Sequence, residues 1–251
     1  MPKINYKIVV LIASVILIAL YLYLAHSYIF YRISAANLKY VNMQQVYTIN
    51  DNMDSEDNVV YTALGDSLTA GAGVDDYQQS FPYIVAQKIA KNDSRVTLKD
   101  FSVPGYKTQD LLDFLVTPAV ASSSDIITLL VGTNDIYNNV SQENFTENYR
   151  AILDKIKTID AARVYLISIP FIGSQSLIFP PYSFYYDKCI ENFNKIISDL
   201  AQEYGFAYVD IATPTKDLFK SDGPHYSADA FHPAAPGYAL WANIIYDAIN
   251  K

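Results

Sequence analysis

Short apolar runs and helix-like segments alternate along the chain from residue 59 to its end. The short runs, which are typical of buried strands, cover 59–64, 95–101, 125–131, 163–169 and 206–210. Apolar residues at helical spacing fall in 79–91, from 108 onward, and in 141–159, 186–204 and 235–249. Strands that alternate with helices predict a parallel sheet covered on both faces. We therefore expect an α/β fold, a three-layer α/β/α sandwich with five parallel strands in the order 2-1-3-4-5.

The amino-terminal pattern is different, because Ile8 to Ala25 is an uninterrupted run without a charged residue. As a helix this run would be about 27 Å long at roughly 1.5 Å per residue, close to the thickness of a bilayer's hydrocarbon core. Lysines precede the run and tyrosines lie near its far end, as is typical of membrane interfaces: Lys3, Lys7, Tyr21, Tyr23 and Tyr28. Residues 1–31 are therefore predicted to form a transmembrane anchor in the cell membrane.

The competing interpretation of this run is a cleaved signal peptide with Ser34-Ala35-Ala36 as the cleavage site, which would give a secreted protein. We favour a single-pass anchor because the apolar core of a signal peptide is usually shorter. Basic residues flank both ends of the run, and their balance leans towards a cytoplasmic amino terminus. The rest of the chain is then expected outside the cytoplasm, with a polar linker at 32–57, which holds an acidic run at 51–57, and one folded domain at 58–251.

Composition argues against two classes of protein. The net charge is −8 at pH 7 and the pI is about 4.8, whereas a nucleic-acid-binding protein needs a basic face to meet phosphates. Cys189 is the only cysteine, so the chain has no internal disulfide and no cysteine-rich metal site. The sequence also lacks a phosphate-binding loop and a dinucleotide-binding fingerprint.

Polar turns follow the first three predicted strands, and they contain Ser67, Gly105 and Asn134. In open α/β sheets, ligands bind outside the carboxyl ends of the strands. Because those ends meet at one edge of a parallel sheet, we expect the three turns to lie together. The sequence therefore predicts a functional site at this edge.

A serine hydroxyl is a poor nucleophile unless a base lies within hydrogen-bond reach, and that base needs an orienting group. The candidate bases are the three histidines, His26, His225 and His232. His26 borders the apolar run and is a poor candidate. His225 and His232 each follow an aspartate by three residues, at Asp222 and Asp229, so position alone does not separate the two pairs. We favour His232 because its loop leads directly into the last helix.

An attacking serine also needs hydrogen-bond donors for the oxyanion that develops on the substrate. The Ser67 N–H, the Gly105 N–H and the side-chain amide of Asn134 are donors of the right kinds. The stretch Gly65-x-Ser67 lacks the second glycine of the nucleophile elbow, so the α/β-hydrolase pattern is not met.

Four short motifs resemble, in the same order, those of the GDSL/SGNH hydrolase family of serine esterases and lipases. The motifs are Gly65-Asp66-Ser67-Leu68, Val103-Pro104-Gly105, Gly132-Thr133-Asn134-Asp135 and Asp229-Ala230-Phe231-His232-Pro233. Together they span nearly the whole predicted domain. The resemblance implies a flavodoxin-like α/β/α fold and an esterase or lipase activity that proceeds through an acyl-enzyme.

The resemblance also implies a role for each matching residue. Ser67 would be the nucleophile, His232 the base and Asp229 the residue that orients it. The Ser67 N–H, Gly105 and Asn134 would form the oxyanion hole, and Asp66 and Asp135 would support the turns. No metal or organic cofactor is implied. The family often has asparagine where this chain has Asp100, which puts one supporting hydrogen bond in question.

The substrate is expected to be a small-molecule ester of one of two classes. An anchor beside a membrane suits lysophospholipids and other lipid esters, and it equally suits O-acetylated carbohydrate. The aromatic segment 170–186 could line an acyl pocket, touch the bilayer or simply pack over the edge of the sheet. Two alternatives are an O-acetyltransferase on envelope polysaccharide and an inactive, membrane-tethered binding module. The complete serine, histidine and aspartate set argues against the inactive module, and the sequence carries no signal of oligomeric state.

Overall fold

The chain divides into two compact units, residues 1–37 and 38–251. The computed structural model describes residues 6–34, 45–50, 58–91, 94–159, 162–171 and 173–251. In the first unit it describes helix α1 (Tyr6–Ser34), which is long and apolar enough to cross a membrane by length and composition. Residues 35 and 36 of the considered cleavage site, the flanking lysines Lys3 and Lys39, and the acidic run 51–57 lie outside the described residues.

Six strands of the second unit form one sheet in the order β1-β3-β2-β4-β5-β6. Their bounds are β1 (Val46–Ile49), β2 (Asn58–Gly65), β3 (Arg95–Ser102), β4 (Ile126–Leu130), β5 (Arg163–Ile167) and β6 (Ala207–Val209). Strands β2 to β6 run parallel to one another. All residues of the central strand β4 are buried, as expected for a parallel strand covered on both faces. The five parallel strands therefore follow the predicted order.

The sixth strand corrects the sequence analysis, which expected five strands and placed residues 46–49 in a linker. In the structure these residues form β1, which pairs antiparallel with β3 from Val46 opposite Lys99 to Ile49 opposite Val96. The strand is short, and its side chains alternate between exposed and half-buried. Such an edge strand carries little apolar signal of its own, because its stability comes from pairing with a neighbour that is distant in sequence.

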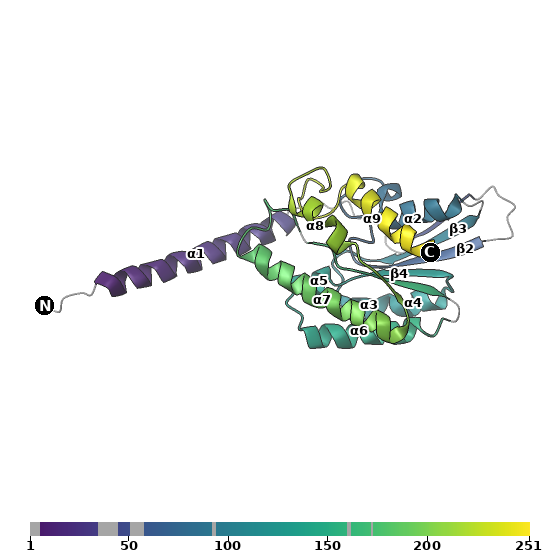
Figure 1. The fold of residues 1–251 in the computed structure, drawn as a ribbon, viewed down its shortest axis with the longest axis horizontal. Coiled ribbons are helices and arrows are strands. Elements are labelled where there is room, and N and C mark those ends of the chain that lie inside the picture. The colour runs from purple at the N-terminus through teal and green to yellow at the C-terminus, as the bar shows by residue number, and fades with distance from the viewer. Residues whose placement is uncertain (1–5, 35–44, 51–57, 92–93, 160–161, 172) are drawn as a thin grey trace. The chain divides into compact units, whose positions relative to one another are not determined.

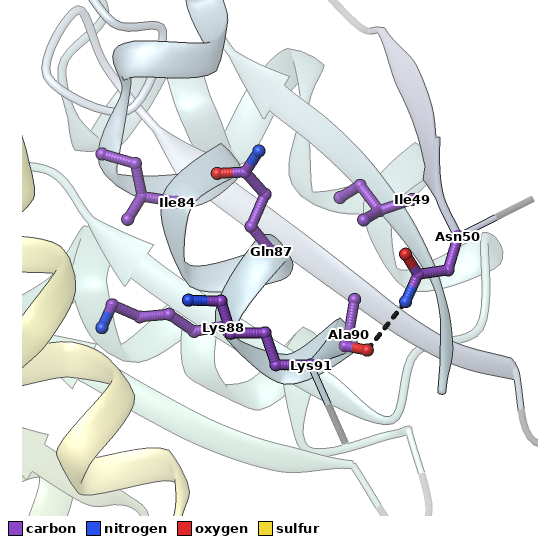
Figure 2. Close-up of a pocket in the computed structure, with 7 residues that line it drawn as sticks. All are labelled: Ile49, Asn50, Ile84, Gln87, Lys88, Ala90 and Lys91. Carbon is purple, nitrogen blue, oxygen red and sulfur yellow. Dashed lines mark hydrogen bonds between the residues drawn. The ribbon is translucent and has the colours of Figure 1, made fainter. Parts of the chain in front are cut away.

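The end of β1 is held against helix α2 (Phe81–Ala90), as Figure 2 shows. Asn50, which adopts a positive φ of 59°, donates a hydrogen bond from its side-chain amide to the Ala90 carbonyl at 2.7 Å. An open groove of about 390 Å³ lies here, with Ile49, Gln87 and Lys88 among its lining residues. The groove is at the end of the sheet opposite to the carboxyl ends of the parallel strands.

Helices cover both faces of the sheet (Figure 1), so the three-layer prediction is confirmed. α2 packs with α9 (Ala235–Ile249) on one face, and the pair of α3 (Thr108–Phe114) and α6 (Gln142–Ile156) lies on the other with α7 (Tyr182–Tyr204). The remaining helical elements are η1 (Tyr77–Gln79), α4 (Val116–Ala121), α5 (Thr133–Tyr137) and α8 (Ala212–Lys220). Trp241 of α9 and Tyr149 of α6 are among the largest fully buried side chains, one on each side of the sheet.

Three helical features differ from the sequence analysis. The helix predicted from residue 108 is divided at Leu115 into α3 and α4, and the short helices α5 and α8 were not predicted. Helix α7 begins at Tyr182, four residues before the predicted start at 186. Much of the aromatic segment 170–186 packs inward, because Phe171, Leu177, Ile178 and Tyr186 are buried, whereas Phe184 and Tyr185 are exposed.

Candidate active site

Ser67 lies in a tight turn directly after β2, at the carboxyl edge of the sheet. The side chain of Asp66 closes this turn by accepting a hydrogen bond from the Leu68 N–H at 3.0 Å. The Ser67 carbonyl accepts from the Ala72 N–H at 2.9 Å, which folds the following residues back over the serine. Ser67 is only 5% exposed. A local Asx turn thus holds the serine backbone in one conformation at the end of a buried strand.

The Ser67 hydroxyl meets His232, which comes from the loop before α9. His232 Nε2 lies 3.1 Å from Ser67 Oγ, and His232 Nδ1 lies 2.7 Å from Asp229 Oδ2. The side chains of His232 and Asp229 are 4% and 6% exposed. The structure therefore brings the three predicted side chains into one hydrogen-bonded chain that is almost closed to solvent.

Asp229 is held by its other carboxylate oxygen. Asp229 Oδ1 accepts hydrogen bonds from the Ser227 hydroxyl at 2.7 Å and from the Phe231 and His232 N–H groups at 2.8 Å each. Ala230 adopts a left-handed φ of 61°, which lets the backbone wrap around the carboxylate. The turn fixes the direction in which Asp229 points at the histidine ring.

Opposing effects set the charge of Asp229. Burial acts to raise the pKa of its carboxyl, but the hydrogen bond and charge of His232 act in the other direction. Asp229 also accepts hydrogen bonds from Ser227 and Phe231. These bonds and the two effects of His232 outweigh burial and lower the pKa of Asp229 to about 2. Asp229 is therefore ionised at neutral pH and is suited to stabilise a protonated His232.

The rival pair Asp222 and His225 does not form the same arrangement. The Asp222 carboxylate accepts from the Ser176 N–H at 3.2 Å, and its pKa is lowered by hydrogen bonds from the side chains of Ser176 and Ser174 and by this backbone bond. The ring of His225 packs near Phe219, with ring centroids 5.9 Å apart. His26 lies in α1, in the other unit of the chain. The structure thus separates two histidine pairs that look alike in the sequence.

The two further turns, which hold Gly105 and Asn134, are tied together. Asn134 lies in the first turn of α5. Its side-chain amide donates a hydrogen bond to the Tyr106 carbonyl at 3.0 Å, and Tyr106 directly follows the exposed Gly105. An amide NH₂ has two hydrogens, so one N–H of Asn134 is left for another acceptor. Among the described residues, the Ser67 and Gly105 N–H groups donate to no other protein group. These donors are available to a bound carbonyl oxygen.

Buried carboxyl groups lie beneath these turns. Asp135 accepts from the backbone and the hydroxyl of Thr108 at 3.0 and 2.5 Å, and burial raises its pKa. Burial likewise raises the pKa of Asp66 and of Asp100 to about 7 each. Asp100, which stands where the family often has asparagine, accepts a hydrogen bond from the Ser102 hydroxyl at 2.5 Å. A carboxyl whose pKa is raised in this way can hold a proton closer to neutral pH than an exposed one, and in its protonated form it can act as a hydrogen-bond donor.

A family model described as the GDSL-like lipase/acylhydrolase family matches residues 63–240, which include all the turns described above. The chain belongs to this GDSL-like lipase/acylhydrolase family. The resemblance that the four motifs indicated is thereby confirmed, and the protein is a GDSL-type esterase or lipase.

A curated relative of this GDSL-type protein is named a lipase, and solved structures with a similar fold include acetylxylan esterases. A spore germination lipase, LipC of Bacillus licheniformis, is 29% identical over 199 residues, which cover 71% of this chain and 90% of that protein. The fold is similar to that of a lipase/acylhydrolase from Enterococcus faecalis, with a TM-score of 0.63 at 22% identity over 76% of this chain and 95% of that one. Axe2, an acetylxylan esterase from Geobacillus stearothermophilus, gives a TM-score of 0.62 at 15% identity over 79% of this chain and 96% of that one.

Several residues that shape this GDSL-type site were not found by sequence reasoning. Ser227 holds Asp229, Thr108 holds Asp135, and the Tyr238 hydroxyl of α9 donates to the Ala72 carbonyl at 2.7 Å. Gly73 packs its backbone against the loop of His232. The contacts of Thr108, Tyr238 and Gly73 join segments that are far apart in the sequence, whereas the Ser227 contact lies within a single turn.

Gly73 yields a prediction, because it separates the serine turn from the histidine loop. A Cβ atom at this position would lie 2.4 Å from the Pro233 carbonyl oxygen and 2.9 Å from His232 Cβ, and the φ of Gly73 is +99°. We expect Gly73→Ala to push the histidine loop away from Ser67. Misplacing a catalytic group by about 1 Å can cost roughly 100-fold in rate, so kcat/KM for an ester should fall by about 10- to 100-fold.

The matched control for this change is Gly205→Ala at the end of α7. Gly205 also has a positive φ, +73°, but a Cβ atom there would meet nothing within 4 Å. The Gly205→Ala substitution should therefore lower the free energy of unfolding by about 1–2 kcal/mol through backbone strain and leave kcat/KM unchanged. Equal activities of the two variants would show that the contact at Gly73 does not set the site geometry.

Proposed function

We propose that this protein is a membrane-anchored serine hydrolase that cleaves carboxylic esters through Ser67, His232 and Asp229. The observation that carries the proposal is the continuous hydrogen-bonded chain from Ser67 Oγ through the imidazole of His232 to the Asp229 carboxylate. In such a chain the serine is the nucleophile, the histidine accepts its proton, and the aspartate carries the negative charge that orients and stabilises the histidine.

Acylation begins when Ser67 Oγ attacks the ester carbonyl carbon and its proton passes to His232 Nε2. Asp229 keeps the proton of His232 on Nδ1, so that Nε2 is free to accept, and it stabilises the imidazolium that forms. The bond between the carbonyl carbon and the alcohol oxygen then breaks, and the alcohol leaves with the proton from His232. Water repeats the sequence on the acyl-enzyme, which releases the carboxylic acid and restores Ser67.

The negative charge on the substrate oxygen needs donors that are already in place. The Ser67 N–H, the Gly105 N–H and the second N–H of the Asn134 side chain fill this role in our proposal. The bond between Asn134 and Tyr106 holds the two later turns in register, so that the donors need not rearrange during the reaction. Asp66 and Asp135 act as supporting residues, because each accepts hydrogen bonds that shape a turn.

Helix α1 would act as a single-pass anchor, with the hydrolase unit outside the cytoplasm. Its length and apolar composition support this assignment, and cleavage of the same segment as a signal would instead yield a secreted enzyme. The substrate belongs to the lipid esters or to O-acetylated carbohydrates. Both classes are represented among similar proteins, since the relative LipC is named a lipase and the structural neighbour Axe2 an acetylxylan esterase.

Covalent labelling tests the proposed nucleophile directly. The full chain, purified in detergent, is incubated with a fluorophosphonate, and the modified residue is located by peptide mass spectrometry. We expect about one phosphonyl group per chain at Ser67, because only a base-activated serine reacts readily. Protein that is unfolded before the incubation serves as the control and should not react. A folded protein without an adduct at Ser67 would instead support an inactive binding module.

A further inference from the structure

Exposed hydrophobic side chains of the hydrolase unit gather at the edge of the sheet that carries Ser67. In the described part of residues 38–251, the large ones are Val46, Phe114, Phe184, Tyr185 and Leu218. The Tyr185 hydroxyl, in the first turn of α7, donates to the Asn139 side chain just after α5 at 3.1 Å. Leu218 belongs to α8, which starts at this edge directly after β6. Single exposed hydrophobic residues are ordinary, but several at one edge indicate an interaction surface.

Ring contacts connect the start of α7 to the proposed catalytic base. The Tyr185 ring stands edge-on to Tyr186 with centroids 5.4 Å apart, and Tyr186 stacks on Tyr137 of α5 at 4.9 Å. Phe231 then meets the Tyr137 ring at 5.4 Å and the His232 ring at 4.8 Å. An unbroken row of rings therefore runs from the exposed Tyr185 to the imidazole of the proposed base.

Phe114 borders the site from the side of the proposed oxyanion donors. Its ring centroid lies 6.1 Å from that of Tyr106, whose carbonyl accepts the hydrogen bond of Asn134. The exposed rings around the site thus form an aromatic rim, which consists of Phe114, Phe184 and Tyr185. The rim is open to solvent, because Phe184 is 70% and Phe114 60% exposed.

The chain enters the hydrolase unit at this same edge. Because β1 is antiparallel to β3, its first residue, Val46, lies opposite Lys99, near the carboxyl end of β3. The Gln45 carbonyl extends the pairing by accepting from the Asp100 N–H at 2.9 Å. Eleven residues, 35–45, separate β1 from the last residue of α1. Even fully extended, this tether spans only about 40 Å at roughly 3.3–3.6 Å per residue.

The length of the tether favours one orientation of the hydrolase unit at a membrane. Helix α7 has 23 residues and runs from the carboxyl edge of the sheet to its opposite end (Figure 1). At roughly 1.5 Å per residue it is about 35 Å long. If the opposite end faced the bilayer, the tether would have to run almost fully extended along the unit, which is costly in conformational entropy. With the carboxyl edge towards the bilayer, the tether needs no such extension.

We propose that the aromatic rim is a docking surface for the lipid bilayer that α1 crosses, so that the site of Ser67 faces the membrane surface. The inference rests on the proposed function, from which it takes both the anchor and the nucleophile. Aromatic rings suit the zone between lipid headgroups and acyl chains, where one part of the side chain is apolar and the other is wet. A weak affinity of the rim is sufficient, because the anchor already holds the unit at a high local concentration beside the bilayer.

Quenching by lipid-borne probes tests the docking. The full chain, with Cys189→Ser so that it has no other thiol, is labelled with the fluorophore NBD at Lys188→Cys and reconstituted in phosphatidylcholine vesicles. Lys188 is exposed and lies one turn beyond Phe184 on the same face of α7. Doxyl-labelled phosphatidylcholine should quench this label at least about twofold more than the control label. The control label is the same fluorophore at Gln202→Cys, an exposed position near the other end of α7.

Variants of the rim connect the quenching to its aromatic rings. Phe114→Ser combined with Phe184→Ser should lower the quenching at the start of α7 to the level of the control label. Hydrolysis of water-soluble p-nitrophenyl acetate should stay within a few-fold of wild type, because neither ring takes part in the proposed chemistry. Phe206→Ser is the matched control, since the half-buried Phe206 lies between α7 and β6 at the opposite end of the sheet. This control variant should leave the quenching unchanged.

The other outcomes contradict either the docking or the function on which it rests. Equal quenching of the two labels, or none, would mean that the rim does not dock on lipid. A blue-shifted emission at Lys188→Cys without quenching would show that protein, such as a second copy of the chain, covers the rim instead. Fluorophosphonate labelling of the same vesicles separates the two proposals: if Ser67 reacts without quenching, only the docking is wrong, whereas quenching without reaction at Ser67 refutes the serine hydrolase. A chain that does not float with the vesicles would overturn both the anchor and the docking.

Discussion

Replacing Ser67 by alanine is expected to lower kcat/KM for a short aryl ester by about 10⁴-fold or more. In the proposed mechanism, the substitution removes the atom that forms the acyl-enzyme, whereas the proposed oxyanion donors and the substrate contacts remain. Those remaining groups explain why some acceleration over water should survive. The measurement is the initial rate of p-nitrophenol release by the purified full chain at saturating and subsaturating ester.

The same variant should keep its fold. Ser67 Oγ makes one hydrogen bond, to His232, and the net worth of such a bond to stability is about 1 kcal/mol. Ser80→Ala is the matched control, since Ser80 is also buried but its hydroxyl has no hydrogen-bond partner among the described residues. Both variants should unfold close to the wild-type temperature, and only Ser67→Ala should lose activity. If Ser67→Ala hydrolyses the ester at the wild-type rate, Ser67 is not the nucleophile and the proposed mechanism is wrong.

The second large effect separates the two histidines of the last loop. His232→Ala should reduce kcat/KM about as severely as Ser67→Ala, because serine and base act as a unit in such sites. His225→Ala should stay within a few-fold of wild type. The His225 backbone carbonyl accepts from the Ala234 N–H at 2.8 Å, a contact that the alanine variant keeps, so the loop should hold its shape.

Parallel ester assays of the two histidine variants decide between them. Combining His232→Ala with Ser67→Ala provides the internal check, because the double variant should be hardly slower than either single variant if the residues act together. A greater loss in His225→Ala than in His232→Ala would reverse the assignment of the base. It would also mean that the proximity of His232 Nε2 to Ser67 Oγ is not the catalytic contact.

The helices and strands that the sequence predicts well are those whose own apolar residues recur at helical spacing or form a continuous run. Helix α6 buries Phe145, Tyr149, Ile152, Leu153 and Ile156, which are the same residues whose helical spacing identifies it. β4 lies in the run Ile126–Val131, which is apolar except for Thr128 and stands between Asp125 and Gly132. By contrast, β1, α5 and α8 are short elements that contacts with distant segments stabilise, and their local sequences resemble turns or polar loops. Tertiary pairing, which a local window cannot contain, is the missing information.

In the candidate site too, some features can be predicted from the sequence, whereas others depend on contacts between distant segments. Residue chemistry and position are enough to propose Ser67 as the nucleophile and two aspartate–histidine pairs as candidates for the base, because chemistry restricts which residue types can serve. They are not enough to separate Asp229 from Asp222, since the difference depends on which backbone amides each carboxylate meets. Gly73 is a further example, because its sequence neighbourhood gives no hint that it lies against Pro233.

The antiparallel strand β1 has a consequence for how long the folded chain stays soluble. An uncovered edge strand offers unpaired backbone groups to another molecule and promotes aggregation. β3 is eight residues long and would be such an edge, but β1 covers it with four residues, and the opposite edge β6 has only three. A shortened chain that starts at residue 58 would uncover β3 along its full length. One that starts before residue 45 keeps both edges of the sheet short and protected.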